Sequence, residues 1–446
     1  ANLATLGAIL LFGMTVTELR HTPAPPTGTP GEYEIIVRER LSEREGKTAS
    51  GTTIRARRNS ATGEWLPAAG NLVVRCDSST ALNPGDRAVV RGKIYPFTAR
   101  HGGYGRLMTR RGYVGTLYLN RSSLLLRDTL HRELSPKHLS LFLHERAVAR
   151  LDRLALAPDE QALCNAMTAG DRRSLSPALR AAYSRSGTSH LLAVSGLHVG
   201  IVFLLANLLL WWLPLFRHGH ILRNIAVILL IWLYAATTGF PPSVVRAALM
   251  FSVLQFALAS SSEYVGMNTL AGVAFVMLLF HPDYLFDISF QLSFIAVAGI
   301  IAWGLPLCRL LRTRRKSIDM LTATLAIGFS ASAATAPLIS HTFGQISVVG
   351  LALNPVVILL SYVVVGSCTL WLVIPGTALA PLFSVVAGFA ARAQNELIRA
   401  AAALPAAALD IRLTTTQCWI VYGLFIFATL LLWSAERKKS VSSLPE

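Results

Sequence analysis

Charged side chains are scarce in this sequence, and their scarcity limits the class of protein that it can encode. Asp, Glu, Lys and Arg together make up 15% of the 446 residues, whereas hydrophobic residues make up 53%. A soluble domain of ordinary composition carries about 25% charged residues. Because hydrocarbon penalises charge, this deficit and a mean hydropathy of +0.49 indicate a protein that resides largely in a lipid bilayer.

Motifs for cofactors and energy coupling are missing as well. The five cysteines include no CxxC pair, no His or Cys group has metal-ligand spacing, and no GxxxxGK[ST] phosphate loop occurs. We therefore expect no metal, no cofactor and no ATP hydrolysis. Cys308, Cys368 and Cys418 lie in or beside apolar runs. Cys76 and Cys164 fall in the soluble part, where a disulfide between them is an alternative to two free thiols.

Acidic residues are fewer than basic residues. The chain has 24 Asp and Glu and 41 Lys and Arg, for a net charge of +17. Part of this excess follows the positive-inside bias of membrane proteins. Basic clusters at 217–223, 309–316 and 437–439 therefore predict cytoplasmic loops and a cytoplasmic C-terminus. Four apolar runs separate the first two clusters, so both face the same side, and residues 31–188 are expected outside.

Apolar runs suited to membrane spans, which need about 20 residues, follow residue 188. They lie at 191–215, 222–238, 243–260, 266–281, 285–305, 320–338, 345–373 and 415–433. Residues 1–20 fit the later part of another transmembrane helix. The pair Asn354-Pro355, inside the seventh run, favours a broken or re-entrant helix. We predict a transmembrane helical bundle at 189–435 and a basic tail at 436–446.

Between residues 31 and 127 the pattern changes to short alternating strands. Segments such as EYEIIVRER, RAVVRGKIY and YVGTLYLN are separated by turn sequences such as LNPGD and ARHGGYG. Short strands at this spacing favour an OB-like β-barrel. Residues 128–188 carry apolar positions every three to four residues, which predicts an amphipathic helical connector. The expected fold is a polytopic α-helical membrane protein with an inserted OB-like barrel.

The predicted barrel combines arginine with aromatic residues, as proteins do that bind single-stranded nucleic acid without sequence preference. Positive charge follows the phosphate backbone and aromatic rings stack on the bases. The alternative is a solvated basic face over core aromatics; Phe97 and Tyr118 are further rings of this segment. The candidate DNA-binding residues are Arg55, Arg57, Arg58, Arg75, Arg87, Arg91, Lys93, Arg106, Arg110, Arg111, Trp65, Tyr95, Tyr104 and Tyr113.

The segment SHLLAVSGLHVG places two imidazoles and a hydroxyl at the mouth of a long apolar helix. Ser195 and His198 are three residues apart and share one helical face. Three interpretations remain open. The residues line a path through the bundle, or they form a nucleophile pair of an intramembrane hydrolase, or they bond neighbouring helices while Gly196 and Gly200 permit close packing. The sequence nominates neither an orienting acid nor an oxyanion site for a hydrolase.

Further polar residues occur in or beside the predicted spans. Arg246 follows GFPPSVV and would either snorkel to the interface or face a wet cavity. Asp287 suits the first turn of a helix, where an acid complements the helix dipole, and Gln291 lies one turn deeper. The candidate channel residues are His190, Ser195, Gly196, His198, Arg246, Asp287, Gln291, Ser293, His341 and Asn354.

Three of these segments together resemble a known family. HLLAVSGLHVG, GFPPSVVRAALM and PDYLFDISFQLSF occur in one order and resemble the bacterial ComEC-type competence proteins, the inner-membrane channels for transforming DNA. The segment 31–127 resembles the OB-like extracytoplasmic domain that precedes their membrane domain. The motif residues that carry over are Ser195, Gly196, His198, Pro242, Arg246, Asp287, Gln291 and Ser293.

The resemblance implies passage of single-stranded DNA through the bacterial cytoplasmic membrane and its lipids during natural transformation. Many relatives continue into a metallo-β-lactamase-like domain taken to be a nuclease, whereas this chain contains no HxHxDH-type run. We therefore expect a channel rather than an enzyme, working with a periplasmic DNA receptor, a cytoplasmic motor and a separate nuclease. The alternatives are a transporter of another, anionic solute and an intramembrane hydrolase.

Overall fold

The chain forms two compact units in the computed structural model. The barrel unit comprises residues 1–146 with 276–286, and the helical unit comprises residues 147–275 with 287–446. The expected helix at 1–20 lies outside the described residues. The structure describes residues 27–442 apart from 29, 45–46, 60–61, 78–79, 81, 84, 98–104, 106–107, 110–111, 129–135, 261–265, 348, 375–377 and 405–406.

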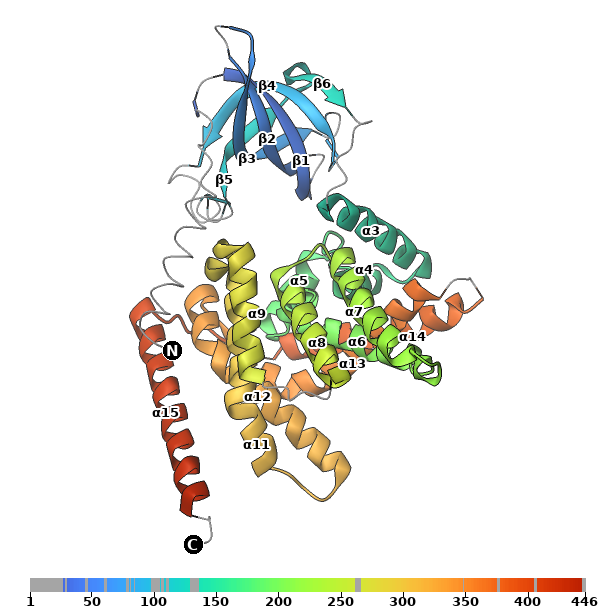
Figure 1. Cartoon of the computed structure of the whole chain (residues 1–446), viewed down its shortest axis with the longest axis vertical. Helices are drawn as coiled ribbons and strands as arrows, with labels where there is room; N and C mark the ends of the chain where they lie inside the picture. The colour runs from blue at the N-terminus through green and yellow to red at the C-terminus, as the bar shows by residue number, and fades with distance from the viewer. Residues whose placement is uncertain are drawn as a thin grey trace. The chain divides into compact units, whose positions relative to one another are not determined.

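The barrel unit contains a sheet that closes on itself (Figure 1). The strand order is β1-β2-β3-β5-β4, β4 pairs again with β1, and β6 adds to β4. Strands β3 and β5 are parallel, and the other pairs are antiparallel. A closed five-stranded circuit of this kind confirms the OB-like barrel. The strands are β1 Pro30–Arg44, β2 Lys47–Arg58, β3 Trp65–Asp77, β4 Arg87–Pro96, β5 Tyr113–Leu119 and β6 Leu124–Asp128.

Alternating side chains build the barrel core, because successive residues of a strand point to opposite faces. In β5, Leu117 and Leu119 are buried in the core while Tyr118 between them is exposed. In β4, Val90 and Ile94 are buried in the same core. The side-chain period of two in the sequence thus corresponds to the inside and outside of the barrel.

At Gly115, β5 lies close to the backbone of β4. A Cβ at this position would lie 2.4 Å from the carbonyl oxygen of Tyr95, which is backbone and cannot move independently. We expect Gly115→Ala to destabilise the barrel by about 1–3 kcal/mol through overpacking. Protease cleavage within the barrel of the full chain should therefore accelerate about 5- to 150-fold. Gly92→Ala, whose Cβ would meet Leu117 at an ordinary 3.4 Å, is the control, and equal rates for both variants would contradict the prediction.

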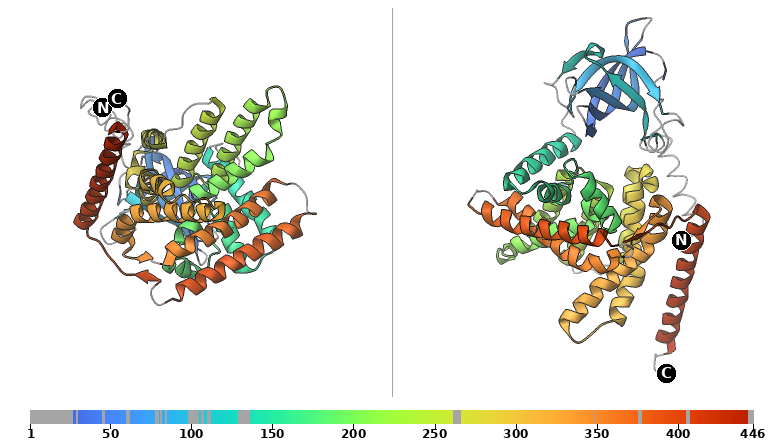
Figure 2. Two further views of the ribbon diagram at one scale, coloured as in Figure 1. Left: turned by 90° about the horizontal axis from the view of Figure 1, so that it is seen from below. Right: turned by 180° about the vertical axis from the view of Figure 1, so that it is seen from behind.

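The helical unit and the connector before it contain long apolar helices (Figures 1 and 2). Each predicted span from 191 to 433 coincides with one of these helices or with the pair α10–α11, which a π-turn at Ile300–Gly304 joins. The helices are α3 Pro136–Leu151, α4 Pro158–Thr168, α5 Pro177–Arg185, α6 Gly196–Leu209, α7 Gly219–Thr237, α8 Pro242–Ser260, α9 Gly266–Phe280, α10 Ile288–Gly299, α11 Leu305–Leu310, α12 Lys316–Phe343, α13 Val349–Val373, α14 Ala380–Ala402 and α15 Thr415–Ser442.

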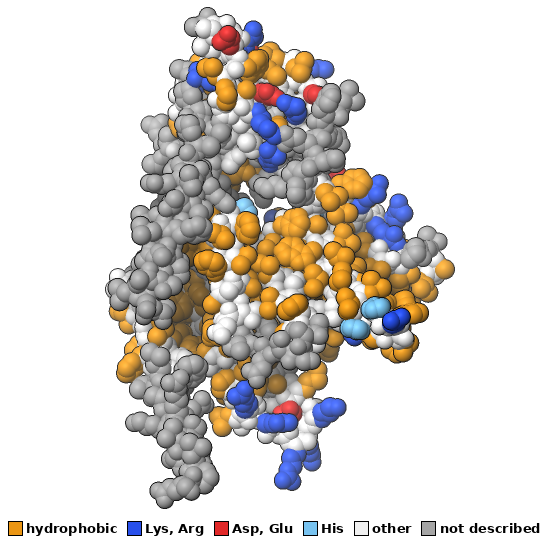
Figure 3. All heavy atoms as spheres, viewed as in Figure 1, with side chains coloured by type: hydrophobic (Ala, Val, Ile, Leu, Met, Phe, Trp, Pro, Cys, Tyr) orange, Lys and Arg blue, Asp and Glu red, His pale blue; other side chains and the backbone are white. Residues whose placement is uncertain are grey.

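Within the described residues, five segments are long and apolar enough to cross a membrane. They are Gly196–Leu215, Gly219–Thr237, Ile288–Leu310, Ile318–Phe343 and Ala352–Val373. Shorter apolar helices lie at Pro242–Leu258, Gly266–Phe280 and Thr415–Thr429. In Figure 3 apolar side chains cover much of the helical unit's visible face, and basic side chains gather at the α11–α12 loop, where Arg312, Arg314 and Arg315 are exposed. The protein is therefore a multi-pass helical membrane protein with a β-barrel domain.

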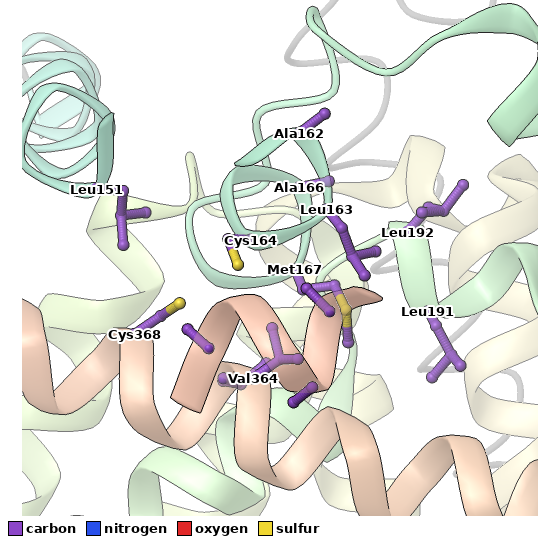
Figure 4. Close-up of a cluster of buried hydrophobic side chains, with 14 of the residues drawn as sticks. Leu151, Ala162, Leu163, Cys164, Ala166, Met167, Leu191, Leu192, Val364 and Cys368 are labelled. Atoms are coloured by element: carbon purple, nitrogen blue, oxygen red, sulfur yellow. The ribbon is translucent and has the colours of Figure 1, made fainter. Parts of the chain in front are cut away.

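The largest apolar cluster of the helical unit lies where α4 and α5 pack against α13 and α14 (Figure 4). Cys164 on α4 and Cys368 on α13 belong to it, both fully buried. Cys76 instead lies in the barrel core, where its Sγ is 3.8 Å from the Thr48 carbonyl. The expectation of a Cys76–Cys164 disulfide is therefore wrong, because neither cysteine forms a disulfide and each is enclosed in a different hydrophobic core.

Helix α13 runs without interruption through Asn354 and Pro355, so the expected break at this pair is absent. Proline removes one backbone donor, and membrane helices accommodate this loss when neighbouring helices surround them. The amphipathic stretch that follows forms α14, whose buried face packs on α4, α5 and α13.

Candidate functional site

Segments far apart in the sequence meet at the start of α6. The Ser243 hydroxyl, in the first turn of α8, donates a hydrogen bond of 2.9 Å to the Val194 carbonyl just before α6. One turn further along α8, the guanidinium carbon of Arg246 lies 5.8 Å from the ring centre of Phe294 on α10. These contacts bring together the three motif segments that carry the family resemblance.

Gly196 and Gly200 permit the close approach of α6 and α8. A Cβ on Gly196 would lie 2.9 Å from Nη2 of Arg246, and one on Gly200 would lie 3.3 Å from Cζ of Phe251. The Phe251 ring stacks on Phe203 of α6, with ring centres 4.8 Å apart. The close-packing interpretation of the two glycines therefore describes this interface. It also explains why the Arg246 guanidinium reaches the first turn of α6.

Ser195 and His198 cap the N-terminus of α6. The Ser195 N–H donates to Nδ1 of His198 over 2.9 Å, and the Ser195 hydroxyl lies 3.3 Å from the same nitrogen. A ring nitrogen that accepts a backbone N–H carries no proton, so this hydrogen bond assigns the proton of the neutral imidazole to Nε2. Because the lone pair of Nδ1 is engaged by the backbone, the arrangement favours helix capping over activation of the Ser195 hydroxyl.

The site holds hydrogen-bond donors without acceptors. Arg246 is only 6% exposed and His198 is fully buried. Their Nε, Nη1 and Nε2 atoms have no hydrogen-bond partner among the described residues. No described carboxylate pairs with Arg246 either. Buried charges in proteins are usually paired or ligated, so an unpaired guanidinium beside a helix N-terminus makes this part of the unit strongly electropositive.

The turn between α7 and α8 is strained where it enters this site. Phe240 has a φ of +53°, in the left-handed region that bulky side chains rarely adopt. Its N–H donates to the Ala235 carbonyl over 2.9 Å, and Pro241 and Pro242 follow it directly. Strain of this kind persists where surrounding structure enforces it, often at functional sites. Here the turn sets the position of Ser243 and so of the first turn of α8.

In the barrel, several of the arginines predicted to bind DNA are engaged internally. Arg58 and Arg91 both pair with Glu32, at 3.1 and 2.5 Å, and Arg87 pairs with Glu34 at 2.6 Å. The Arg91 and Arg58 guanidiniums hold the pKa of Glu32 below its usual value. These ion pairs already occupy three guanidiniums with carboxylates, so these arginines are less available to a polyanion.

The aromatic candidates of the barrel divide into buried and exposed rings. Tyr113 is only 7% exposed and lies in a small cluster with Met108. The prediction that its ring stacks on bases is therefore wrong, because the ring is buried. Tyr95 and Tyr118 are 47% and 52% exposed and meet edge to face, with ring centres 5.8 Å apart. Lys93 Nζ lies 5.7 Å from the centre of the Tyr95 ring.

The other DNA-binding candidates have mixed surroundings. Trp65 is 43% exposed, Arg55 and Arg75 are exposed, and Arg57 is half-buried. Nothing in the structure tests their role, which stays a prediction. Four candidates lie outside the described residues: Tyr104, Arg106, Arg110 and Arg111.

Comparison with known proteins identifies the family. A family described as "Competence protein" matches residues 167–438, which is more than half of the chain. This chain belongs to the competence protein family. It is 33% identical over 204 residues to ComE operon protein 3 of Bacillus subtilis (strain 168), across 45% of this chain and 24% of that protein. It is 29% identical over 201 residues to an uncharacterized protein of Aquifex aeolicus (strain VF5), across 45% of each. No solved structure matches.

Other motif residues of this competence protein have contacts of their own. Asp287 caps α10 by accepting from the N–H groups of Ser289 and Phe290. His341 contacts the Leu413 carbonyl through Nδ1 at 3.0 Å, so it holds the segment before α15. These hydrogen bonds give Asp287 and His341 structural roles.

The remaining candidates are distributed over other elements. His190 is exposed in the short 3-10 turn Ser189–Leu192 before α6. Gln291 and Ser293 are half-buried on α10. Asn354, on α13, has a buried side-chain oxygen with no partner among the described residues. The structure records no contact that joins these four to Arg246, and their channel role stays a prediction.

A polar network between α5, α4 and α14 was not predicted from the sequence. The Tyr183 hydroxyl donates to Asn395 Oδ1 at 3.0 Å and accepts from Gln394 Nε2 at 3.3 Å. Arg392 pairs with Glu160 at 2.7 Å beside a cavity of about 400 Å³. Burial raises the pKa of Tyr183, so its hydroxyl remains a donor. The signal was the pair Gln394-Asn395 on the face of α14 that also carries Ala391 and Ile398.

Proposed function

We propose that this protein conducts single-stranded DNA across the bacterial cytoplasmic membrane during natural transformation. The observation that carries the proposal is the meeting of three competence-family motifs within the apolar helical unit, around Arg246, which has no ion-pair partner among the described residues. An intramembrane cation with no protein partner is a functional hypothesis by default. A passing polyanion is a natural ligand for it, because each nucleotide brings one phosphate.

The positions of the basic loops support an orientation with the barrel outside and the C-terminus in the cytoplasm. The loop between α6 and α7 carries Arg217, and the loop between α11 and α12 carries Arg312, Arg314 and Arg315. Four apolar segments lie between these loops, so they return to one side if each crosses the membrane. The positive-inside bias assigns that side to the cytoplasm.

In this proposal the barrel receives the strand and the helices pass it on. Tyr95 and Tyr118 offer exposed rings to bases, and Lys93 offers charge. The engagement of Ser195 and His198 in capping α6 supports conduction rather than hydrolysis by this pair. A DNA receptor, a cytoplasmic motor and a separate nuclease act as partners, since we assign neither force generation nor strand cleavage to this chain.

Proteoliposomes that contain the full chain test the proposal. We expect a labelled 40-nucleotide single strand to become resistant to external nuclease and to be recovered at full length, whereas a duplex of equal length stays accessible. Liposomes without protein are the control. Uptake of a small organic anion without uptake of the strand would favour the transporter alternative, and shortened strands would contradict the proposal that the chain does not hydrolyse DNA.

A further inference from the structure

Arg246 is a buried cation for which the described chain supplies no counter-anion. Arg246 is only 6% exposed, and two of its nitrogens, Nε and Nη1, have no acceptor among the described residues. The Phe294 ring, 5.8 Å from the guanidinium carbon, contributes only a cation–π contact. A guanidinium in such surroundings is costly unless an acceptor with complementary geometry comes from outside the chain.

The guanidinium is directed at the first turn of a helix. Nη2 lies where it would be 2.9 Å from a Cβ on Gly196, the first residue of α6. The first N–H groups of an α-helix have no acceptor within the helix, and the macrodipole adds about half a positive charge there. Ser195 caps this terminus. Gly196 has no side chain, so its backbone is open toward the Arg246 guanidinium.

His198, in the first turn of α6, carries a further buried donor. Its Nδ1 accepts the Ser195 N–H, so Nε2 carries the proton and is buried with no partner among the described residues. Arg246 and the α6 terminus thus both present N–H groups, and no described carboxylate pairs with the guanidinium. A cation would be repelled here, and an apolar ligand would leave every donor unsatisfied.

We propose that Arg246 and the N-terminus of α6 form a binding site for a phosphate-type oxyanion. A tetrahedral oxyanion accepts several hydrogen bonds at once and matches the planar fork of arginine, which a halide does not. Helix N-termini bind such anions through their free N–H groups. That the natural ligand is a phosphodiester of the transported strand rests on the proposed function; the oxyanion site itself does not.

Thermal unfolding of the full chain in detergent, with and without sodium phosphate, tests the site. Sodium chloride at equal ionic strength is the salt control. We expect saturating phosphate to raise the unfolding midpoint of the wild type by about 2–4 °C beyond chloride. Arg246→Gln should lose this shift, whereas Arg309→Gln, which removes an exposed arginine of the α11 end, should keep it. An equal shift in Arg246→Gln, or an equal effect of chloride, would overturn the proposal.

Gly196→Ala gives a second route if Arg246→Gln does not fold. It keeps the arginine but places a Cβ 2.9 Å from Nη2, so we expect at least half of the phosphate-dependent shift to disappear. An unchanged shift would also overturn the site. Ten-residue oligothymidylate separates the two sources of phosphate. If inorganic phosphate stabilises through Arg246 and the oligonucleotide does not, the oxyanion site stands and its assignment to DNA fails.

Discussion

Arg246→Met is expected to lower DNA uptake about 10- to 100-fold while leaving the protein at least as stable as the wild type. The loss of uptake follows from charge-assisted hydrogen bonds, which contribute about 1.5–3 kcal/mol. The stability follows from the absence of a counter-anion among the described residues, because a buried cation without a partner costs free energy that a methionine of similar length does not. Function and stability therefore change in opposite directions.

Uptake into proteoliposomes and the thermal midpoint in detergent measure the two effects. Arg309→Met provides a matched control, because it removes the same charge from an exposed position beside the α11–α12 loop. We expect it to change neither quantity by more than the experimental scatter. If Arg246→Met lowered the midpoint by several degrees in parallel with uptake, the arginine would be a structural residue, and its role in conduction would have no support.

The architecture was readable from the sequence because it depends on periodic patterns. In YVGTLYL the odd positions Leu117 and Leu119 are buried and Tyr118 is exposed, as a strand with a period of two requires. Tyr118 faces outward, whereas Tyr113 precedes a register shift against β3 and is buried in a separate cluster with Met108. Composition alone selected Tyr113 as a base-stacking residue, whereas the strand parity would have selected Tyr118.

Partners that lie far apart in the sequence could not be predicted. Glu32 pairs with Arg58 and Arg91, which follow it by 26 and 59 residues, and the pairing depends on the order of strands in the closed barrel. His341 meets the carbonyl of Leu413, 72 residues later. No local propensity encodes such contacts, because they arise only when the topology brings two segments together.

The site around Arg246 could be predicted only in part from the sequence. The sequence singled out Ser195, His198 and Arg246 as separate polar residues, and the family resemblance grouped them. It did not identify Phe294 or Ser243, the residues that join α10 and α6 to α8. Both are ordinary residue types for a membrane helix, and only their contacts distinguish them. The expected break in α13 was wrong because Pro355 removes only one backbone donor, a loss that a continuous helix accommodates.

Replacing both Tyr95 and Tyr118 by alanine is expected to weaken single-strand binding about 10- to 100-fold. Stacking of a base on an aromatic ring contributes about 1–3 kcal/mol and tolerates any base. Both rings are about half exposed, and their edge-to-face contact leaves ring surface available. Fluorescence anisotropy of a labelled oligothymidylate with the full chain in detergent measures the affinity.

The conservative variants decide whether stacking is the cause. Replacing both residues by phenylalanine keeps the rings and should keep affinity within about threefold, because the phenol hydroxyl takes no part in stacking. Tyr113→Phe, in the buried cluster with Met108, should leave binding unchanged. Lys93→Ala should lower the slope of log affinity against log salt by about 0.7, as the loss of one phosphate contact requires. Binding that survives the double alanine change, or that is lost equally in the double phenylalanine change, would exclude this pair as the stacking platform. In that case the exposed Trp65 would be the next ring to test.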